Sequence, residues 1–315
     1  MASSLQFAEP RNKLTDGLDA PRLVLVEQAK QEQGARFFPR DPAFVRRLAP
    51  LVARYTGFFQ PEVRGIDHLP EHGPVLLVGN HSSTTFMPDM WITTLAILAR
   101  RGLEQPAYAL THNLYLSLPG LRGVLGRIGC IPADRSQAEA ALSEGALVLV
   151  YPGGDYEACR PWRDRDRIDF AGRQGFVRLA LRSQVPVVPV VAHGAQHTVV
   201  VLSRGEALAR AFGLNRLRVK VVPLMLGPPF GVTPIPPLPM PAAITVEFLS
   251  SLDWSGLGPE AAEDQAVVDA CYKEITGLMQ ATLNRLSAED PHPLLRGVTQ
   301  LLLHGPAHVA APPRK

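Results

Sequence analysis

A histidine and an aspartate stand at the end of an apolar run. Residues 75–79 lead into Asn80 and His81, and Pro88 and Asp89 follow a short hydroxylic stretch. A carboxylate on one ring nitrogen fixes the tautomer of a histidine and leaves the other nitrogen to accept a proton. His81 and Asp89 are therefore a candidate general-base pair. The alternative is a histidine that caps the strand end, with an unrelated aspartate in the first turn of a helix.

Two other corners of the chain carry polar residues after apolar runs. Arg135 follows a short predicted strand and is expected to point into the same crevice as His81, although a plain strand-to-helix corner with Ser136 as the cap explains it equally. The turn Pro152, Gly153 and Gly154 is glycine-rich, and Glu157 follows it. Glycine permits positive φ and lets a substrate approach the backbone amides closely. The alternative is a tight turn with a solvated glutamate.

The elements that must position these residues alternate along the chain. Buried strands are predicted at 75–79, 107–110, 146–151, 185–192 and 244–249, and helices at 88–101, 119–127, 136–144, 174–183 and 263–288. This alternation indicates an α/β fold with a largely parallel central sheet flanked by helices, whose ligand crevice lies at the carboxyl ends of the strands. Pro186 and Pro189 suit only an edge strand or a strand that lines a tunnel.

The remaining boundaries follow from composition. Residues 1–40 are expected to be partly loose, with a short helix at 21–33, and residues 291–315 to form an apolar and then disordered tail around a domain at 60–290. Residues 41–59 predict a helix that is capped by Asp41 and kinked at Pro50 and has an apolar face. That face either packs on the core or contacts a membrane, with arginines at headgroup level.

Composition excludes several classes of protein. The chain of 315 residues is 46% hydrophobic and has a net charge of +3, too small to indicate nucleic acid as a partner. Its three cysteines have neither disulfide nor metal spacing, and we expect no metal site. No transmembrane run and no signal-peptide core occur, which predicts a peripheral protein on the cytoplasmic face of a membrane. The motifs of serine hydrolases, P-loop nucleotide hydrolases and Rossmann dehydrogenases are missing.

Four stretches in this order resemble the glycerolipid and lysophospholipid acyltransferase family, over about residues 60–255. The family carries N-H-x4-D, a G…(D)R block, a P-E-G or P-G-G block, and V-P-[IV]-[VI]-P. Here these blocks are Asn80-His81…Asp89, Gly129…Asp134-Arg135, Pro152-Gly153-Gly154…Glu157 and Val185-Pro186-Val187-Val188-Pro189. The usual histidine-to-aspartate interval ends at Phe86, so the role of the aspartate passes to Asp89, as in a branch of the family with H…P-x-D spacing.

The resemblance implies a single acyltransferase domain that moves a fatty acyl group directly from a thioester to a hydroxyl. His81 is the implied base, and amides near Gly153 and Gly154 stabilise the oxyanion. The acyl donor is acyl-CoA or acyl carrier protein as a cosubstrate, no cofactor is needed, and the partner is a membrane lipid surface. The oligomeric state stays open.

The third block indicates the acceptor. It lacks the common E-G-T-R form, whose arginine is associated with acceptor phosphates, and PGGDYEA resembles the block of mono- and diacylglycerol acyltransferases. We therefore expect an acylglycerol to be preferred over lysophosphatidic acid, with Glu157 bonded to an acceptor hydroxyl. Donor or acceptor binding is assigned to Asn80, Arg135, Pro152, Gly153, Gly154, Glu157, Arg160, Arg173, Pro186 and Pro189.

Three alternatives remain at this stage. The arginines from Arg160 to Arg173 bind coenzyme phosphates or anionic headgroups, or else they form a solvated face paired with Asp164, Asp166 and Asp169. The acceptor is an acylglycerol or a lysophospholipid such as lysophosphatidic acid. The chain is an enzyme, a lipid-binding protein without turnover, or a hydrolase that releases fatty acid from thioesters.

Overall fold

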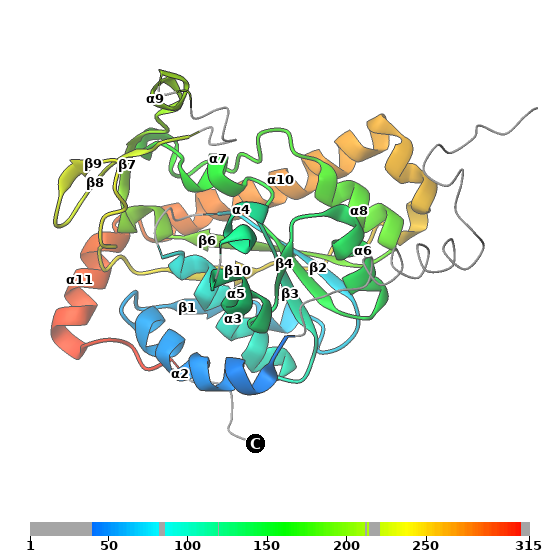
Figure 1. Ribbon diagram of the computed structural model, residues 1–315, viewed down its shortest axis with the longest axis horizontal. Helices are drawn as coiled ribbons and strands as arrows, with labels where there is room; N and C mark the ends of the chain where they lie inside the picture. Colours follow the sequence, from blue (N-terminus) through cyan, green and yellow to red (C-terminus); the bar gives the residue numbers. More distant parts are fainter. Residues whose placement is uncertain (1–39, 82–85, 119, 212, 214–220, 310–315) are drawn as a thin grey trace, which may run out of the picture.

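A seven-stranded sheet forms the centre of the computed structural model, which describes residues 40–81, 86–118, 120–211, 213 and 221–309 (Figure 1). The strands lie in the order β1-β10-β6-β2-β5-β3-β4. Neighbours pair in parallel except β10 and β6, which are antiparallel. Their bounds are β1 (Glu62–Arg64), β2 (Val75–Gly79), β3 (Ala107–Thr111), β4 (Cys130–Pro132), β5 (Leu147–Val150), β6 (Val187–His193) and β10 (Thr245–Phe248). The largely parallel α/β sheet predicted from the sequence is confirmed.

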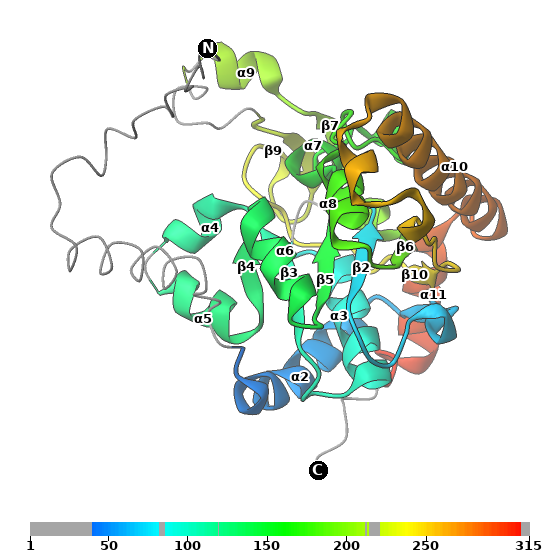
Figure 2. The same ribbon diagram turned by 90° about the vertical axis from the view of Figure 1, so that its right-hand side faces the viewer.

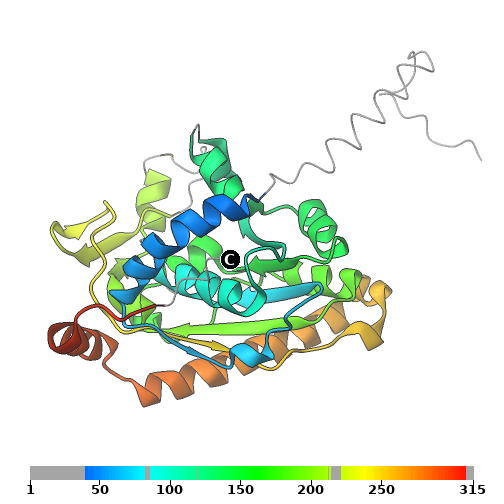
Figure 3. The ribbon, with the colours of Figure 1, turned by 90° about the horizontal axis from the view of Figure 1, so that it is seen from below.

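Helices cover both faces of this sheet. One face packs against α3 (Pro88–Arg101), and α2 (Pro42–Gly57) lies over α3. The other face packs against α6 (Arg135–Ser143), α8 (Gly175–Ser183) and α10 (Gln265–Glu289). Figures 2 and 3 show α2 and α10 on opposite sides of the sheet. Because both faces are covered, β2 is buried at every position, as its continuous apolar sequence predicts.

The helix α2 begins where its sequence predicts. Asp41 accepts a hydrogen bond from the Phe44 N–H at 2.9 Å, and Pro42 takes the first helical position. The helix runs on through Pro50 to Gly57. Its apolar side packs inward, with Ala49 and Ala53 about 95% buried against Leu95 of α3. The structure therefore shows core packing for this side of the helix, and contact of the helix with a membrane stays a prediction.

Strand β6, which contains Pro189 and follows Pro186, lies in the interior of the sheet, and this corrects the expectation of an edge strand. β6 stands between β10 and β2, and Pro189 pairs with Val78. The Pro189 carbonyl accepts a hydrogen bond from the Leu249 N–H at 2.9 Å, just beyond the last residue of β10. In a strand, N–H and C=O of one residue face the same neighbour. The nitrogen of Pro189, which has no N–H to donate, therefore faces the end of β10. No hydrogen bond within the paired part of the two strands is lost there.

A smaller sheet and a terminal helix were not predicted. The second sheet contains β7 (Val200–Ser203), β8 (Leu224–Gly227) and β9 (Gly231–Thr233), all antiparallel. The expected tail contains α11 (Pro293–His304) instead. Short helices complete the chain: α4 (Asn113–Ser117), α5 (Leu121–Arg127), α7 (Gly154–Ala158) and α9 (Glu206–Ala211). The predicted loose N-terminus with its helix at 21–33, and the disorder expected at the end of the chain, lie outside the described residues.

Candidate active site

The structure brings His81 and Asp89 together. His81 follows the carboxyl end of β2, and Asp89 lies in the first turn of α3. The distance from His81 Nδ1 to Asp89 Oδ2 is 3.6 Å, and the two residues are 8% and 0% exposed. A carboxylate in the first turn is favoured by the helix dipole, and burial strengthens its pull on an imidazolium. The ring of His81 is thereby oriented by Asp89, while Nε2 is the nitrogen on the other side of the ring.

The backbone before α3 bends sharply to return Asp89 to the histidine. Phe86 and Met87 adopt left-handed conformations with φ of 56° and 46°. Such conformations cost about 1–3 kcal/mol each for residues with a side chain and occur at functional turns. The Tyr55 hydroxyl of α2 donates a hydrogen bond of 3.2 Å to the Phe86 carbonyl. Helix α2 thus supports the turn that compensates for the long histidine-to-aspartate interval.

Two buried, oppositely charged side chains hold the backbone of His81. Glu157 Oε2 accepts a hydrogen bond from the His81 N–H at 2.8 Å, and Arg160 Nη2 donates one of 3.2 Å to the His81 carbonyl. Glu157 and Arg160 also pair with each other, at 3.5 Å between Oε1 and Nη1. Their exposures are 1% and 3%. We call this arrangement the Glu157–Arg160 clamp, and sequence reasoning assigned both of its residues to substrate binding instead.

Burial dominates the ionisation of the clamp. It raises the pKa of Glu157 to about 7, although Arg160 and the amides of His81 and Asp169 oppose the shift. Burial also lowers the pKa of Arg160, against the attraction of Glu157. Both side chains are enclosed, and their hydrogen bonds to the His81 backbone indicate a positioning role. Their assignment to ligand binding stays a prediction.

The glycine turn is fitted to the clamp. A Cβ on Gly153 would stand 2.5 Å from Glu157 Oε2, so only glycine leaves room for the glutamate. Gly154 has φ of 48° and donates its N–H to the Tyr151 carbonyl at 3.0 Å. That N–H is thus engaged in the turn itself, which removes Gly154 from the expected oxyanion donors. Gly153 retains that role only as a prediction.

Arg173 also stabilises this turn. Its Nη1 donates to the carbonyls of Pro152 and Gly153 at 3.2 and 2.8 Å, and its Nη2 lies 3.2 Å from Asp155 Oδ1. These contacts account for the position of Arg173 without a bound phosphate. Pro152 contributes through its carbonyl, so both residues support the turn, and a direct substrate contact by either one stays a prediction.

Asn80 and Tyr151 fix the strand end beside the histidine. The Asn80 side chain donates to the Ala192 carbonyl at 3.0 Å and accepts from its N–H at 2.7 Å, and this extends the join between β2 and β6. The Tyr151 ring stacks on His81 with centroids 5.1 Å apart. A Cβ on Gly79 would stand 2.5 Å from this ring. Asn80 therefore anchors the strand end rather than a ligand.

The other predicted residues lie apart from this cluster. Arg135 begins α6, is 60% exposed at its side chain and pairs with Glu139 at 2.9 Å on the same helix. The cap of that helix is Asp134, which accepts a hydrogen bond from the Ser136 N–H, and not Ser136 as the sequence suggested. Pro186 precedes β6 and accepts a backbone hydrogen bond from Leu76. No described contact joins Arg135 or Pro186 to His81, and their ligand-binding roles stay predictions.

An apolar pocket lies between α2, α3 and the sheet. Residues of α2, α3 and strands β3, β4 and β5 line it, and it is partly open to solvent. Along α3 the lining starts at Met90, next to Asp89, and continues through Thr94 to Leu98. The pocket lining thus follows the same face of the sheet that α3 covers, while His81 and Asp89 are not among the lining residues. Such an apolar space suits a hydrocarbon chain.

Sequence reasoning did not identify this pocket, since only packing shows which faces of α2 and α3 leave space between them. Over the parts of the chain that the structure describes, no group of three or more histidine, cysteine, aspartate or glutamate side chains is placed to hold a metal ion. The three cysteines are buried and unpaired.

Comparison with known proteins gives consistent matches. The acyltransferase family model matches residues 60–193. An uncharacterised protein of Mycobacterium tuberculosis is 27% identical over 261 residues, which are 80% of this chain and 69% of that protein. The chicken "DGAT1/2-independent enzyme synthesizing storage lipids" is 24% identical over 73% of this chain and 65% of its own length. The crystal structure of a 1-acyl-sn-glycerophosphate acyltransferase of Thermotoga maritima covers 84% of this chain and 89% of that one, with a TM-score of 0.47 at 15% identity.

Proposed function

We propose that this chain, whose residues 60–193 match the acyltransferase family model, transfers a fatty acyl group from a thioester to the hydroxyl of a glycerolipid. The observation that carries the proposal is the buried His81–Asp89 pair, and helix α3, which carries Asp89, also lines the apolar pocket. A general base and a binding site for the hydrocarbon chain are the two parts that such a transfer requires.

The pair supplies the base. His81 Nε2 accepts the proton of the acceptor hydroxyl as the oxygen attacks the thioester carbonyl. The carbon–sulfur bond then breaks, and the thiol leaves with the proton that His81 returns. Asp89 stabilises the imidazolium that forms between these steps. General-base catalysis of this kind contributes roughly 10²–10⁴-fold.

The apolar pocket supplies the binding site for the acyl chain. Burying methylene groups contributes about 0.8 kcal/mol each, so a long chain binds much more tightly than a short one. Helix α3 carries Asp89 and also contributes Met90, Thr94 and Leu98 to the pocket, so one helix joins the candidate site to the space for the chain. The thioester carrier, coenzyme A or acyl carrier protein, is the remaining part of the donor.

We further propose that an electrically neutral acylglycerol is the preferred acceptor. A phosphate monoester is normally held by dedicated arginine or lysine donors. Arg160 is enclosed in the clamp, and Arg173 is bonded to the turn and to Asp155. Asp155, on α7 directly after the turn, is half exposed and repels a phosphate. The chicken relative, whose printed name describes synthesis of storage lipids, is consistent with this choice.

Competition between acceptors tests the proposal. The purified protein is given radiolabelled acyl-CoA together with monoacylglycerol, diacylglycerol and lysophosphatidic acid at equal surface concentrations, and the lipid products are separated. Labelled di- or triacylglycerol is expected to exceed labelled phosphatidic acid. Faster acylation of lysophosphatidic acid would overturn the acceptor assignment, and release of free fatty acid without any ester product would overturn acyl transfer itself.

A further inference from the structure

Two elements expose large apolar side chains without a covering layer among the described residues. The exposed residues are Leu226, Phe230, Val232, Ile235 and Leu238 on β8–β9 and the segment that follows, and Leu295, Leu302 and Leu303 on α11. Leu302 is 81% exposed and Phe230 is 56% exposed. On a water-soluble surface, such clusters mark sites that contact another apolar phase.

Both elements lie at the end of the sheet where the candidate base is. Strand β6 runs parallel to β2, so its carboxyl end lies at the same edge as His81. The chain leaves β6 through a short 3₁₀ turn at Ala195–Thr198 and enters β7 directly. Helix α11 contacts the same turn. Figures 1 and 3 show α11 and the β8–β9 hairpin at one end of the molecule.

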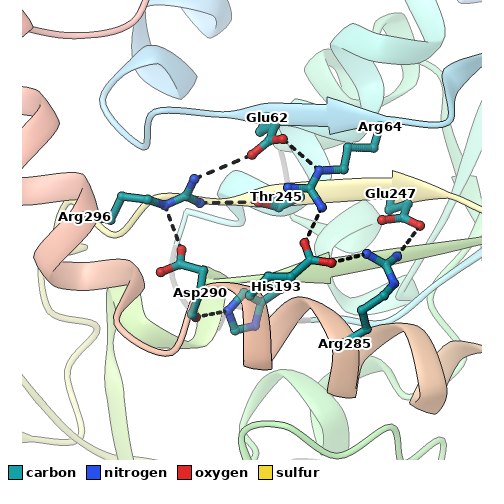
Figure 4. A network of polar contacts seen from close by, with 9 residues as sticks. Glu62, Arg64, His193, Thr245, Glu247, Arg285, Asp290 and Arg296 are labelled. Atoms are coloured by element: carbon teal, nitrogen blue, oxygen red, sulfur yellow. Dashed lines mark hydrogen bonds and ion pairs between the residues drawn. The ribbon is translucent and has the colours of Figure 1, made fainter.

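An ion-pair network fixes the orientation of α11 (Figure 4). Arg296 of α11 lies 2.7 Å from Asp290 Oδ2 and 3.5 Å from Glu62 Oε2 of β1. Arg64 joins β1 to Glu289 at the end of α10 at 2.6 Å. Gly297 packs directly on the Pro241 carbonyl, where a Cβ would collide. Because Arg296 and Gly297 face the sheet, Leu295 and Leu302 stand on the opposite side of the helix.

Two sequence segments that contain these elements have basic but no acidic residues. Residues 207–246 and 291–315 contain no aspartate or glutamate, although the chain has 29 of them. The first segment contains Arg210, Arg216, Arg218 and Lys220, and the second contains Arg314 and Lys315 besides Arg296, which faces the sheet. An excess of basic residues in the sequence around exposed apolar side chains complements a bilayer that contains anionic lipids, because apolar side chains enter the headgroup boundary and cations attract the headgroups.

A contact also links the second sheet to helix α7, which follows the glycine turn at Pro152, Gly153 and Gly154. Arg204, which follows β7, donates from Nε to the Tyr156 carbonyl at 3.2 Å and lies 3.8 Å from the centre of the Tyr156 ring. Tyr156 belongs to α7, which carries Glu157 of the clamp. The second sheet is thereby joined to the residues that position His81.

We propose that the β8–β9 hairpin and α11 form a lipid-docking surface, which turns the sheet edge that carries His81 toward an anionic bilayer. The inference rests on the proposed function only for the need to reach a lipid acceptor. The sequence led us to expect vesicle binding by α2 and by the apolar tail that contains α11; the structure adds the β8–β9 hairpin, whose apolar side chains are exposed, whereas the inner side of α2 is buried.

Vesicle flotation tests the surface. The full chain is mixed with vesicles of phosphatidylcholine and phosphatidylglycerol, and with vesicles of phosphatidylcholine alone. Two double variants are compared with the wild type, Leu302→Ser with Leu303→Ser and Phe230→Ser with Val232→Ser. The control is Leu278→Ser, a half-exposed leucine of α10. Each double variant is expected to bind anionic vesicles roughly tenfold or more weakly, since two large apolar side chains are lost from the bilayer contact, and the control to bind as the wild type does.

Several results would contradict the proposal that this surface docks on lipid. They are wild-type binding by both double variants, no vesicle binding by the wild type, or a protein dimer that these substitutions dissociate without any change in vesicle binding. A second assay separates this inference from the proposed function. With a short-chain acyl thioester and a water-soluble acylglycerol, the double variants are expected to transfer acyl groups at the wild-type rate. A wild type that binds vesicles but transfers nothing in either assay would refute the enzyme and leave the docking surface standing.

Discussion

Replacement of Arg160 by lysine separates the positioning of the histidine from the binding of substrate. Arg160 uses two different nitrogens, Nη2 for the His81 carbonyl at 3.2 Å and Nη1 for Glu157 at 3.5 Å. A lysine keeps the charge but has one compact ammonium group, which is not a fork that reaches both acceptors. The variant is therefore expected to keep its pair with Glu157 and to lose its hold on His81.

The size of the effect follows from burial. Leaving a buried carbonyl without its hydrogen bond costs about 1–3 kcal/mol. If the displaced His81 forfeits this amount in the transition state, kcat falls roughly ten- to hundredfold. KM for donor and acceptor is expected to stay the same, because Arg160 does not line the apolar pocket. Steady-state kinetics below the unfolding transition measures both constants.

Arg163→Lys is the matched control, since its side chain is 85% exposed and its pairing with Asp164 is peripheral. The control is expected to have wild-type kcat and KM. An Arg160→Lys variant with wild-type kcat would refute the view that the clamp positions His81. A rise in KM with unchanged kcat would instead return Arg160 to the ligand-binding role expected from the sequence.

Two further predictions concern the clamp and the pocket. The pKa of Glu157 is about 7 in the folded protein, above its ordinary value of 4.5. The protonated carboxyl therefore contributes to the free energy of unfolding. This contribution is complete below the ordinary value and is lost as pH rises through about 7. Urea unfolding should show the wild type losing up to about 3 kcal/mol more than Glu157→Gln between about pH 5 and pH 8, and equal losses would contradict this. Leu48→Trp fills part of the pocket from α2 and should lower kcat/KM for palmitoyl-CoA but not for octanoyl-CoA; an equal loss for both would show that the acyl chain lies elsewhere.

The central sheet was predictable because its strands are buried on both faces. A strand such as β2, apolar at every position, differs clearly from the amphipathic helices beside it, and its bounds at 75–79 agree with the prediction. The cap at Asp41 has an equally local cause. Short strands without an apolar run, such as β1 and β9, carry no comparable signal, and the second sheet was missed for this reason.

The site was predictable only in part. The proximity of His81 and Asp89 followed from the motif, but the turn at Phe86 and Met87 that makes the longer interval work is a matter of three-dimensional geometry. Glu157 and Arg160 were found, but their contacts with the His81 backbone were not foreseen, because charged residues are usually exposed and a sequence does not reveal that both are buried. Their spacing of three residues on one helical turn was the available signal for a pair.

The lipid-docking surface was also predictable only in part. The arginines of α2 suggested headgroup contact, and the leucines of α11 belonged to a stretch expected to be an apolar and then disordered tail. Only the packing of Ala49 on Leu95, and of Gly297 on Pro241, shows which apolar side is covered and which stays open.

Acyl transfer by the His81→Ala variant tests the central claim most directly. The wild type, His81→Ala and Asp89→Asn are given radiolabelled acyl-CoA and the preferred acylglycerol under conditions where circular dichroism shows all three folded. Loss of the base in His81→Ala is expected to abolish ester formation, and Asp89→Asn, which keeps the shape but not the charge beside the imidazole, to slow it at least about tenfold. Wild-type ester formation by His81→Ala would contradict the mechanism.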